Sequence, residues 1–309
     1  SYPNYNLNSP YSIPIGYDEE AWNNIEKTER SNILLNLWKN KNVSGTYEPG
    51  STFKLITASV GLEEGIVEMD TPNDFTCTGA YSVDPNEKPI SCWRKEPHGS
   101  LSLRGALCNS CNPAFIQLGQ RIGVERLYKY FRAYGLFDSV GNDIARAYNG
   151  TFHDIEKIVP TELATISFGQ RFEISPLQLI TAVSAICNDG VLVKPKIVKQ
   201  IENTDTGSIE IVETEKIRQV ISKETADNIK NMMSSVVIDG TGKRAQVKGY
   251  SIGGKSGTSE PKPGREADGY VASFIAISPI ENTQIVVLVT IEGLQEYAHH
   301  QGGETAGPA

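Results

Sequence analysis

Two residues whose chemistry could work together, Ser51 and Lys54, stand three positions apart in the chain. Side chains at positions i and i+3 of a helix lie close together, so the lysine amine can reach the serine hydroxyl. A serine is a poor nucleophile until a neighbouring base takes its proton, and a lysine kept neutral by its surroundings can be that base. Residues 48–50, Glu-Pro-Gly, form a turn signal just before the serine. We therefore expect a helix that begins near Ser51 and carries a nucleophile on its first turn.

Two further polar motifs could complete a site for acyl transfer. Ser110 offers a hydroxyl that can relay a proton, and Asn112 offers both a donor and an acceptor to a substrate amide. Lys255, Ser256 and Thr258 follow two glycines, a pattern that predicts an edge strand to which a substrate backbone can come close. Each motif alone is common in turns and loops. In this order, the three predict one site with a nucleophile, a base, a proton relay and substrate anchors.

The pattern of apolar residues predicts the elements that must position these motifs. Between 51 and 65 it predicts a buried helix behind the serine, whereas 70–100 has little periodicity and is expected to be irregular. Short turns between the last strands favour antiparallel pairing, and helices followed by adjacent strands indicate the α+β class. Further helices are expected at 22–38, 101–107, 113–122, 127–134, within 160–186 and at 223–237, strands at 191–201, 250–258, 269–278 and 283–292, and a hairpin at 202–215.

Composition narrows the range of functions. The chain has 309 residues, of which 39% are hydrophobic and 21% charged, as is ordinary for a folded domain. Its formal net charge of -8 argues against a nucleic-acid partner. No stretch approaches the roughly 18 consecutive apolar residues of a membrane span. Because the chain starts at Ser1 without a methionine, we expect a fragment or a processed form from which a membrane anchor has been removed.

Longer stretches around the three motifs resemble the transpeptidase domain of class B penicillin-binding proteins. The resemblance covers nearly the whole chain, and the stretch from Cys92 to Asn112 is similar to that of sporulation-specific members of the stage V sporulation protein D type. It implies an α+β fold with a mostly antiparallel five-stranded sheet, covered by helices, and an all-helical subdomain. It also implies one transpeptidase domain over 1–309, with an upstream anchor and N-terminal domain missing. The matching segments are 47–54, 168–170, 174–178, 240–242, 254–258 and 302–308.

The resemblance also implies a role for each motif residue. Ser51 attacks the D-Ala–D-Ala carbonyl of a peptidoglycan stem peptide, Lys54 acts as its base, and Ser110 relays the proton to the released D-alanine. An amine from a neighbouring strand then resolves the acyl-enzyme and forms a crosslink. The backbone N–H groups of Ser51 and Thr258 form the oxyanion hole. β-Lactams acylate the same serine as substrate mimics.

Substrate binding and partners follow from the same resemblance. Asn112 holds the stem amide, while Lys255, Ser256 and Thr258 bind the carboxylate region. The implied partners are stem peptides, β-lactam antibiotics and a membrane glycosyltransferase. The implied location is the extracytoplasmic face of the bacterial cytoplasmic membrane.

Three other activities use similar motif residues. A class A β-lactamase needs a deacylating glutamate, and no Glu-x-x-Leu-Asn pattern occurs between the second and third motifs. A D,D-carboxypeptidase has the same motif residues as a transpeptidase. A β-lactam sensor also retains them, but its usual cytoplasmic protease module has no counterpart in this chain.

Four cysteines and a histidine lie within residues 77–111, around the second motif. Structural zinc sites take four Cys or His ligands. If Ser110 and Asn112 face a substrate, Cys111 points inward, where a metal could fix the shape of the loop. Cys108 is the main substitute within the set. The predicted zinc ligands are Cys77, Cys92, His98 and Cys111.

The same cysteines have two other interpretations. A disulfide such as Cys77–Cys92 suits an extracytoplasmic chain, and buried free cysteines act as small hydrophobic residues. Because the chain has five cysteines, disulfides cannot use them all, and Cys187 is expected in the core. His299 and His300 are expected to be solvated. No cofactor is needed for the acyl transfer itself.

Overall fold

The computed structural model describes residues 6, 8–138, 143, 149–261, 264, 268–295 and 301–309. The helices are α1 (Glu19–Asn24), α2 (Lys27–Trp38), α3 (Lys41–Ser44), α4 (Lys54–Glu63), α5 (Leu103–Cys108), α6 (Asn112–Ile122), α7 (Val124–Ala133), α8 (Pro160–Ile166), α9 (Pro176–Cys187), α10 (Lys223–Ile238) and α11 (Gly302–Thr305), with 3-10 turns η1 (Gly50–Phe53), η2 (Ile155–Lys157) and η3 (Lys243–Ala245). The strands are β1 (Phe75–Cys77), β2 (Ala80–Tyr81), β3 (Ile90–Ser91), β4 (Gly99–Leu101), β5 (Val191–Val193), β6 (Gln200–Glu202), β7 (Ile209–Ile211), β8 (Lys216–Gln219), β9 (Gly253–Ser259), β10 (Tyr270–Ser278) and β11 (Ile285–Leu294).

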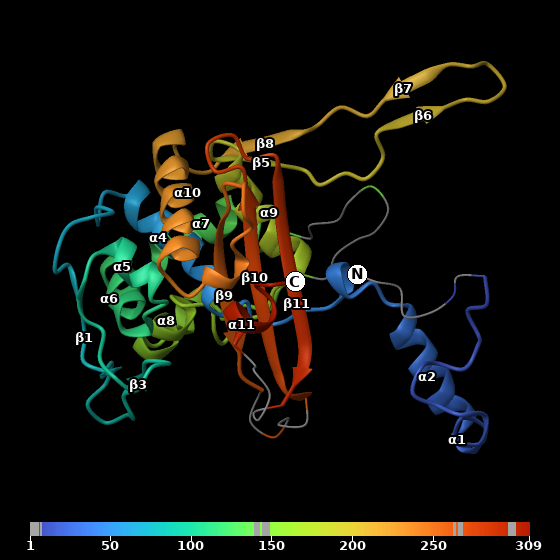
Figure 1. Ribbon diagram of the computed structural model, residues 1–309, viewed down its shortest axis with the longest axis horizontal. Helices are drawn as coiled ribbons and strands as arrows, with labels where there is room; N and C mark the ends of the chain where they lie inside the picture. The colour runs from blue at the N-terminus through green and yellow to red at the C-terminus, as the bar shows by residue number, and fades with distance from the viewer. Residues whose placement is uncertain are drawn as a thin grey trace.

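An antiparallel sheet in the order β11-β10-β9 forms the centre of the fold (Figure 1). Helices α9 and α10 pack against it from the helical side, and the short α11 packs on β9 and β10. On β9, Lys255 pairs with Ile275 and Ser256 with Phe274, so neighbouring residues of the third motif point to opposite faces. The expected α+β class and antiparallel pairing are confirmed.

The number of strands in the main sheet differs from the expectation. Three strands pair in it within the described residues, whereas the family resemblance implied five. The predicted strand at 191–201 is interrupted because Pro195 has no backbone N–H to donate. Its two halves pair elsewhere, β5 with β8 and β6 with β7. The β6–β7 hairpin projects from the body of the molecule (Figure 1), and all six of its strand residues are exposed.

The helical part of the molecule has α4 at its centre. Residues 54–61 of this helix are all buried, and it contacts α6, α7, α9 and α10. Just before it, the Phe53 ring makes edge-to-face contacts with Phe131 and Phe172, with ring centroids 5.1 and 4.7 Å away. Such aromatic contacts prefer this geometry and add to the burial of the rings. Apolar packing therefore fixes the start of α4 against the hydrophobic core.

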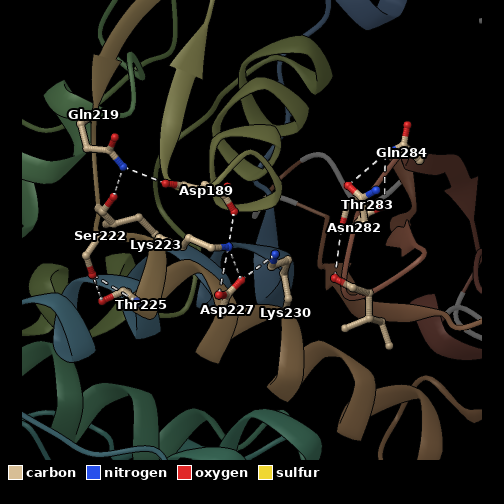
Figure 2. A network of polar contacts seen from close by, with 12 residues as sticks. Asp189, Gln219, Ser222, Lys223, Thr225, Asp227, Lys230, Asn282, Thr283 and Gln284 are labelled. Carbon is tan, nitrogen blue, oxygen red and sulfur yellow. Dashed lines mark hydrogen bonds and ion pairs between the residues drawn. The ribbon is translucent and has the colours of Figure 1, made fainter.

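A polar network fixes the start of α10, the long helix that lies beside β9 (Figure 2). Ser222 caps the helix by accepting a hydrogen bond from the backbone N–H of Thr225. Lys223 contacts Asp189 at 2.7 Å, and the buried Lys230 contacts Asp227 at 2.8 Å. This network holds α10 in place without reaching the motif residues.

Among the residues that the structure describes, no helix is both long and apolar enough to cross a bilayer.

Candidate active site

The first motif lies where the 3-10 turn η1 runs into α4. Ser51 is half-buried on this turn, and Lys54, fully buried, is the first residue of the helix. The two residues are three positions apart across this junction, a spacing that brings side chains to the same side of the turn. Gly50 has φ +55°, and a Cβ there would lie 2.8 Å from the carbonyl oxygen of Thr258. A side chain at position 50 would therefore push β9 away from the serine.

The Lys54 amine contacts the second motif directly. Its Nζ donates to the backbone oxygen of Ser110 at 2.7 Å and to Asn112 Oδ1 at 2.7 Å, and it lies 3.3 Å from Ser110 Oγ. Burial lowers the pKa of Lys54 to about 7, although the nearby Cys111 and Cys92 act in the opposite direction. Near neutral pH a large share of this amine is therefore uncharged and able to accept a proton.

The second motif is held in a strained conformation between α5 and α6. Ser110 has φ +51°, which is uncommon for a residue with a side chain. Its Oγ accepts a hydrogen bond from Lys255 Nζ at 2.9 Å. Burial, and then the charge of Lys54, lower the pKa of Lys255 well below its usual range. Two buried lysines thus meet at one hydroxyl, an arrangement that can pass a proton across it.

The three motifs surround a cleft of about 570 Å³. Ser51, Ser110, Asn112, Ser256 and Thr258 line it, while Lys54 and Lys255 lie buried behind the two serines. All seven residues predicted to act on the substrate therefore converge on one place. The cleft follows β9, which is an outer strand among the described residues. An extended peptide could pair with its open edge.

Some cleft residues had no role in the sequence analysis. Thr241 Oγ1 lies 2.9 Å from Ser256 Oγ, and Thr258 Oγ1 accepts a hydrogen bond from Gly302 N at 3.1 Å. The segments 240–242 and 302–308 had been matched to the family without a role for either, and their glycines were the signal that could have placed them beside β9. Other cleft residues carry no such signal: Trp93, Lys243, Arg244, Glu260 and Tyr270.

The cysteine and histidine side chains predicted as metal ligands meet directly behind the second motif. One ligand atom from each lies within 4.8 Å of the others, and the three cysteines are buried. His98 Nδ1 lies 3.5 Å from Cys77 Sγ and 3.5 Å from Cys92 Sγ. Its Nε2 is buried without a hydrogen-bond partner among the described residues. Cys111 is the N-cap of α6, so the cluster is attached to the loop that presents Ser110.

The remaining cysteines and histidines lie apart from this cluster. Cys108 is outside the ligand set, and its backbone oxygen accepts a hydrogen bond from Thr241 N at 3.1 Å. Cys187 is half-buried on α9 and packs against the core as expected, and all five cysteines are free thiols. His299 and His300 lie outside the described residues.

Comparison with known sequences identifies relatives that match most of the chain. The penicillin binding protein transpeptidase domain matches residues 12–309. Stage V sporulation protein D of Bacillus subtilis is 36% identical over 273 residues, which is 87% of this chain and 42% of that protein. The probable peptidoglycan D,D-transpeptidase PenA of Neisseria gonorrhoeae is 30% identical over 87% of this chain and 44% of its own length. The chain thus spans less than half the length of these relatives.

Solved structures show the same fold. Penicillin-binding protein A from M. tuberculosis, in a ceftriaxone acyl-enzyme complex, has a TM-score of 0.84 and 25% identity, covering 100% of this chain and 68% of that one. The apo TP domain of Burkholderia pseudomallei penicillin-binding protein 3 has a TM-score of 0.74 and 30% identity, covering 87% and 78%. The sequence matches and the structural matches both agree with an active site built from the three motifs. The chain belongs to the penicillin-binding protein transpeptidase family.

Proposed function

We propose that this chain is a serine D,D-transpeptidase domain that crosslinks peptidoglycan stem peptides through an acyl-enzyme on Ser51. The observation that carries the proposal is the meeting of Lys54 and Lys255 at Ser110, beside an open cleft that contains the nucleophile. The names of the relatives support it, since one is a probable peptidoglycan D,D-transpeptidase and one structure is a β-lactam acyl-enzyme.

The geometry suggests an order for the acylation steps. Uncharged Lys54 takes the proton of Ser51 as the serine oxygen bonds to the carbonyl carbon of the penultimate D-alanine. The backbone N–H groups of Ser51 and Thr258 stabilise the oxyanion that forms. The peptide C–N bond then breaks, and Ser110 passes a proton to the leaving amine from the lysines behind it. The product pair is the acyl-enzyme and free D-alanine.

Deacylation reverses this proton path. An amine of a neighbouring stem peptide attacks the ester carbon and loses its proton toward Ser110 and Lys54. The ester C–O bond breaks, and Ser51 regains its proton as the new amide is released. During both steps Asn112 holds the donor amide, and Ser256 and Thr258 bind the region of the terminal carboxylate with Lys255 behind them.

We also propose a cellular role, a location and a partner for this chain. Similarity to stage V sporulation protein D favours a sporulation enzyme. The substrate places it on the extracytoplasmic face of the cytoplasmic membrane, held by an anchor outside this chain. A membrane glycosyltransferase that supplies the glycan strands would be its partner.

We further propose that Cys77, Cys92, His98 and Cys111 hold a structural Zn²⁺. Zinc bonds of about 2.3 Å to sulfur and about 2.0 Å to nitrogen, at tetrahedral angles, separate the donor atoms by about 3.5 Å. The two distances from His98 Nδ1 to the sulfurs of Cys77 and Cys92 are 3.5 Å, so the residues fit the ion. A closed set of four ligands leaves no position for substrate. Such a metal would therefore fix the Ser110 loop and take no part in acyl transfer.

A labelled penicillin distinguishes this function from its alternatives. We expect stable label on the wild-type chain and none on Ser51→Ala. Rapid loss of label from the wild type would indicate a β-lactamase. Stable label is then followed by an assay with a stem peptide and an amine acceptor. Crosslinked product supports the transpeptidase, release of D-alanine with hydrolysis alone indicates a carboxypeptidase, and no turnover indicates a sensor.

A further inference from the structure

The cleft has opposite charges at its two ends. Ser256 and Thr258 lie along β9, and Lys243 and Arg244 line the cleft beyond Ser256, on the side of Thr241. Glu304 lies at that same end, 3.8 Å from Arg244. This end is therefore cationic overall, as a site for a terminal carboxylate should be.

Glu260 lies at the other end of the cleft. Glu260 is the first residue after β9, and it lines the cleft together with Ser256 and Thr258. Its carboxylate is exposed and makes no hydrogen bond or ion pair with any residue that the structure describes. The pairing of β9 with β10 ends at Ser259 and Val271, and the next residue on each chain segment, Glu260 and Tyr270, lines the cleft. A carboxylate beside an aromatic ring is a suitable site for an ammonium group.

The proposed function fixes which part of a substrate reaches this end. The donor carbonyl lies at Ser51, and the terminal carboxylate points toward Ser256. The rest of the stem, extended along β9 at about 3.3 Å per residue, then runs toward Glu260. The first side chain beyond the two D-alanines is that of the third stem residue. A long side chain at this position would extend along the cleft toward the end where Glu260 lies.

We propose that Glu260 is a specificity-determining residue that binds a side-chain ammonium group on the third residue of the acyl-donor stem, with Tyr270 as the neighbouring wall. The proposal rests on the transpeptidase function and adds to it the residue that recognises this part of the donor. The two charged ends of the cleft would also set the direction in which the stem lies. An exposed ion pair of this kind gives a preference of about three- to fivefold.

Three acetylated tripeptides ending in D-Ala-D-Ala test this assignment. Their first residue is lysine, Nε-acetyl-lysine or Nε-succinyl-lysine, so that the side chain is cationic, neutral or anionic. We measure kcat/KM for D-alanine release and divide it by each variant's rate of penicillin acylation, which corrects for any loss of folded protein. Wild type should prefer the lysine donor, Glu260→Gln should lose the preference, and Glu260→Lys should prefer the succinyl donor. Glu304→Gln, at the opposite end of the cleft, is the matched control and should keep the wild-type order.

Unchanged discrimination in both Glu260 variants would overturn the proposal. Competition of the tripeptides with labelled penicillin for Ser51 gives the same preference as inhibition constants and needs no turnover. Penicillin acylation without D-alanine release would count against the transpeptidase function alone, because the inhibition constants would still report the role of Glu260. Equal inhibition by all three peptides in the wild type would count against Glu260 alone.

Discussion

The two walls that bring Ser51 and Ser110 together are stabilised in different ways. On one side, α4 lies in the hydrophobic core, and every residue from Lys54 to Gly61 is buried. On the other side, Ser110 sits in a strained turn between α5 and α6. The short strands β1 to β4 and the cluster of Cys77, Cys92, His98 and Cys111 support this turn. The first wall owes its position to apolar packing. The helices α5 and α6 of the second wall also pack in the core, but the loop between them is held in addition by polar contacts and the cysteine cluster.

This difference matters because Lys54 joins the two walls. Its backbone belongs to the core helix, whereas its amine is bound by Ser110 and Asn112. A buried amine with three such contacts is well placed only if both walls keep their positions. Changes to the core should therefore lower stability first, and changes to the cluster should lower acylation first.

The largest effect is expected when the group that joins the walls is removed. Lys54→Met takes away the proposed base and leaves the acceptors on Ser110 and Asn112 without their donor. We expect penicillin acylation to fall by about 10²–10⁴-fold. Lys230→Met is the matched control, since Lys230 is also a buried lysine but lies on α10 with Asp227 as its partner. Acylation in Lys54→Met within tenfold of that in the control would contradict the assigned role.

The second-largest effect is expected when the cysteine cluster behind the Ser110 loop is disrupted. With Cys77→Ala, or after treatment with a strong chelator, the chain should contain about one zinc fewer than the untreated wild type. Acylation should fall by about 100-fold, because a shift of about 1 Å in a catalytic group has an effect of that size. Metal content, acylation rate and melting temperature are measured together. Cys108→Ala is the control, as Cys108 is a neighbouring thiol outside the ligand set. A chain that contains no metal and responds equally to both substitutions would exclude the zinc site.

The third prediction uses the pH dependence of acylation to compare how the two walls affect the pKa of Lys54. Burial lowers the pKa of Lys54 to about 7, while Cys111 and Cys92 on the opposite wall act to raise it. In the proposed mechanism the uncharged amine is the active form, so the acylation rate constant should be half-maximal near pH 7, level off above about pH 8 and fall about tenfold per unit well below pH 7. Stopped-flow acylation between pH 5.5 and 9 gives the profile. A midpoint near the ordinary lysine value would mean that the cluster outweighs burial.

The comparison also explains which features could be predicted from the sequence. The helix behind Ser51 could be predicted because its run of apolar residues reports burial directly. The ligand set could be proposed because Cys and His are few and lie close together along the chain. The meeting of Lys54 and Lys255 at Ser110 could not be derived from spacing, since it joins residues 56 and 145 positions apart. The split of the predicted strand at 191–201 was missed because Pro195 was not weighed as an interruption.

The smallest effect tests a contact between the cluster and the Ser110 loop. Trp93 follows Cys92, and its indole Nε1 donates to the backbone oxygen of Asn109 at 2.9 Å while the ring lines the cleft. The side chain is 49% exposed, so loss of one hydrogen bond should cost about 0.5–1 kcal/mol, which is a two- to fivefold decrease in acylation. Trp93→Phe keeps an aromatic wall without the donor, and Trp93→Ala removes both. If Trp93→Phe acylates like the wild type and Trp93→Ala does not, the ring acts as a wall of the cleft and the hydrogen bond does not position the loop.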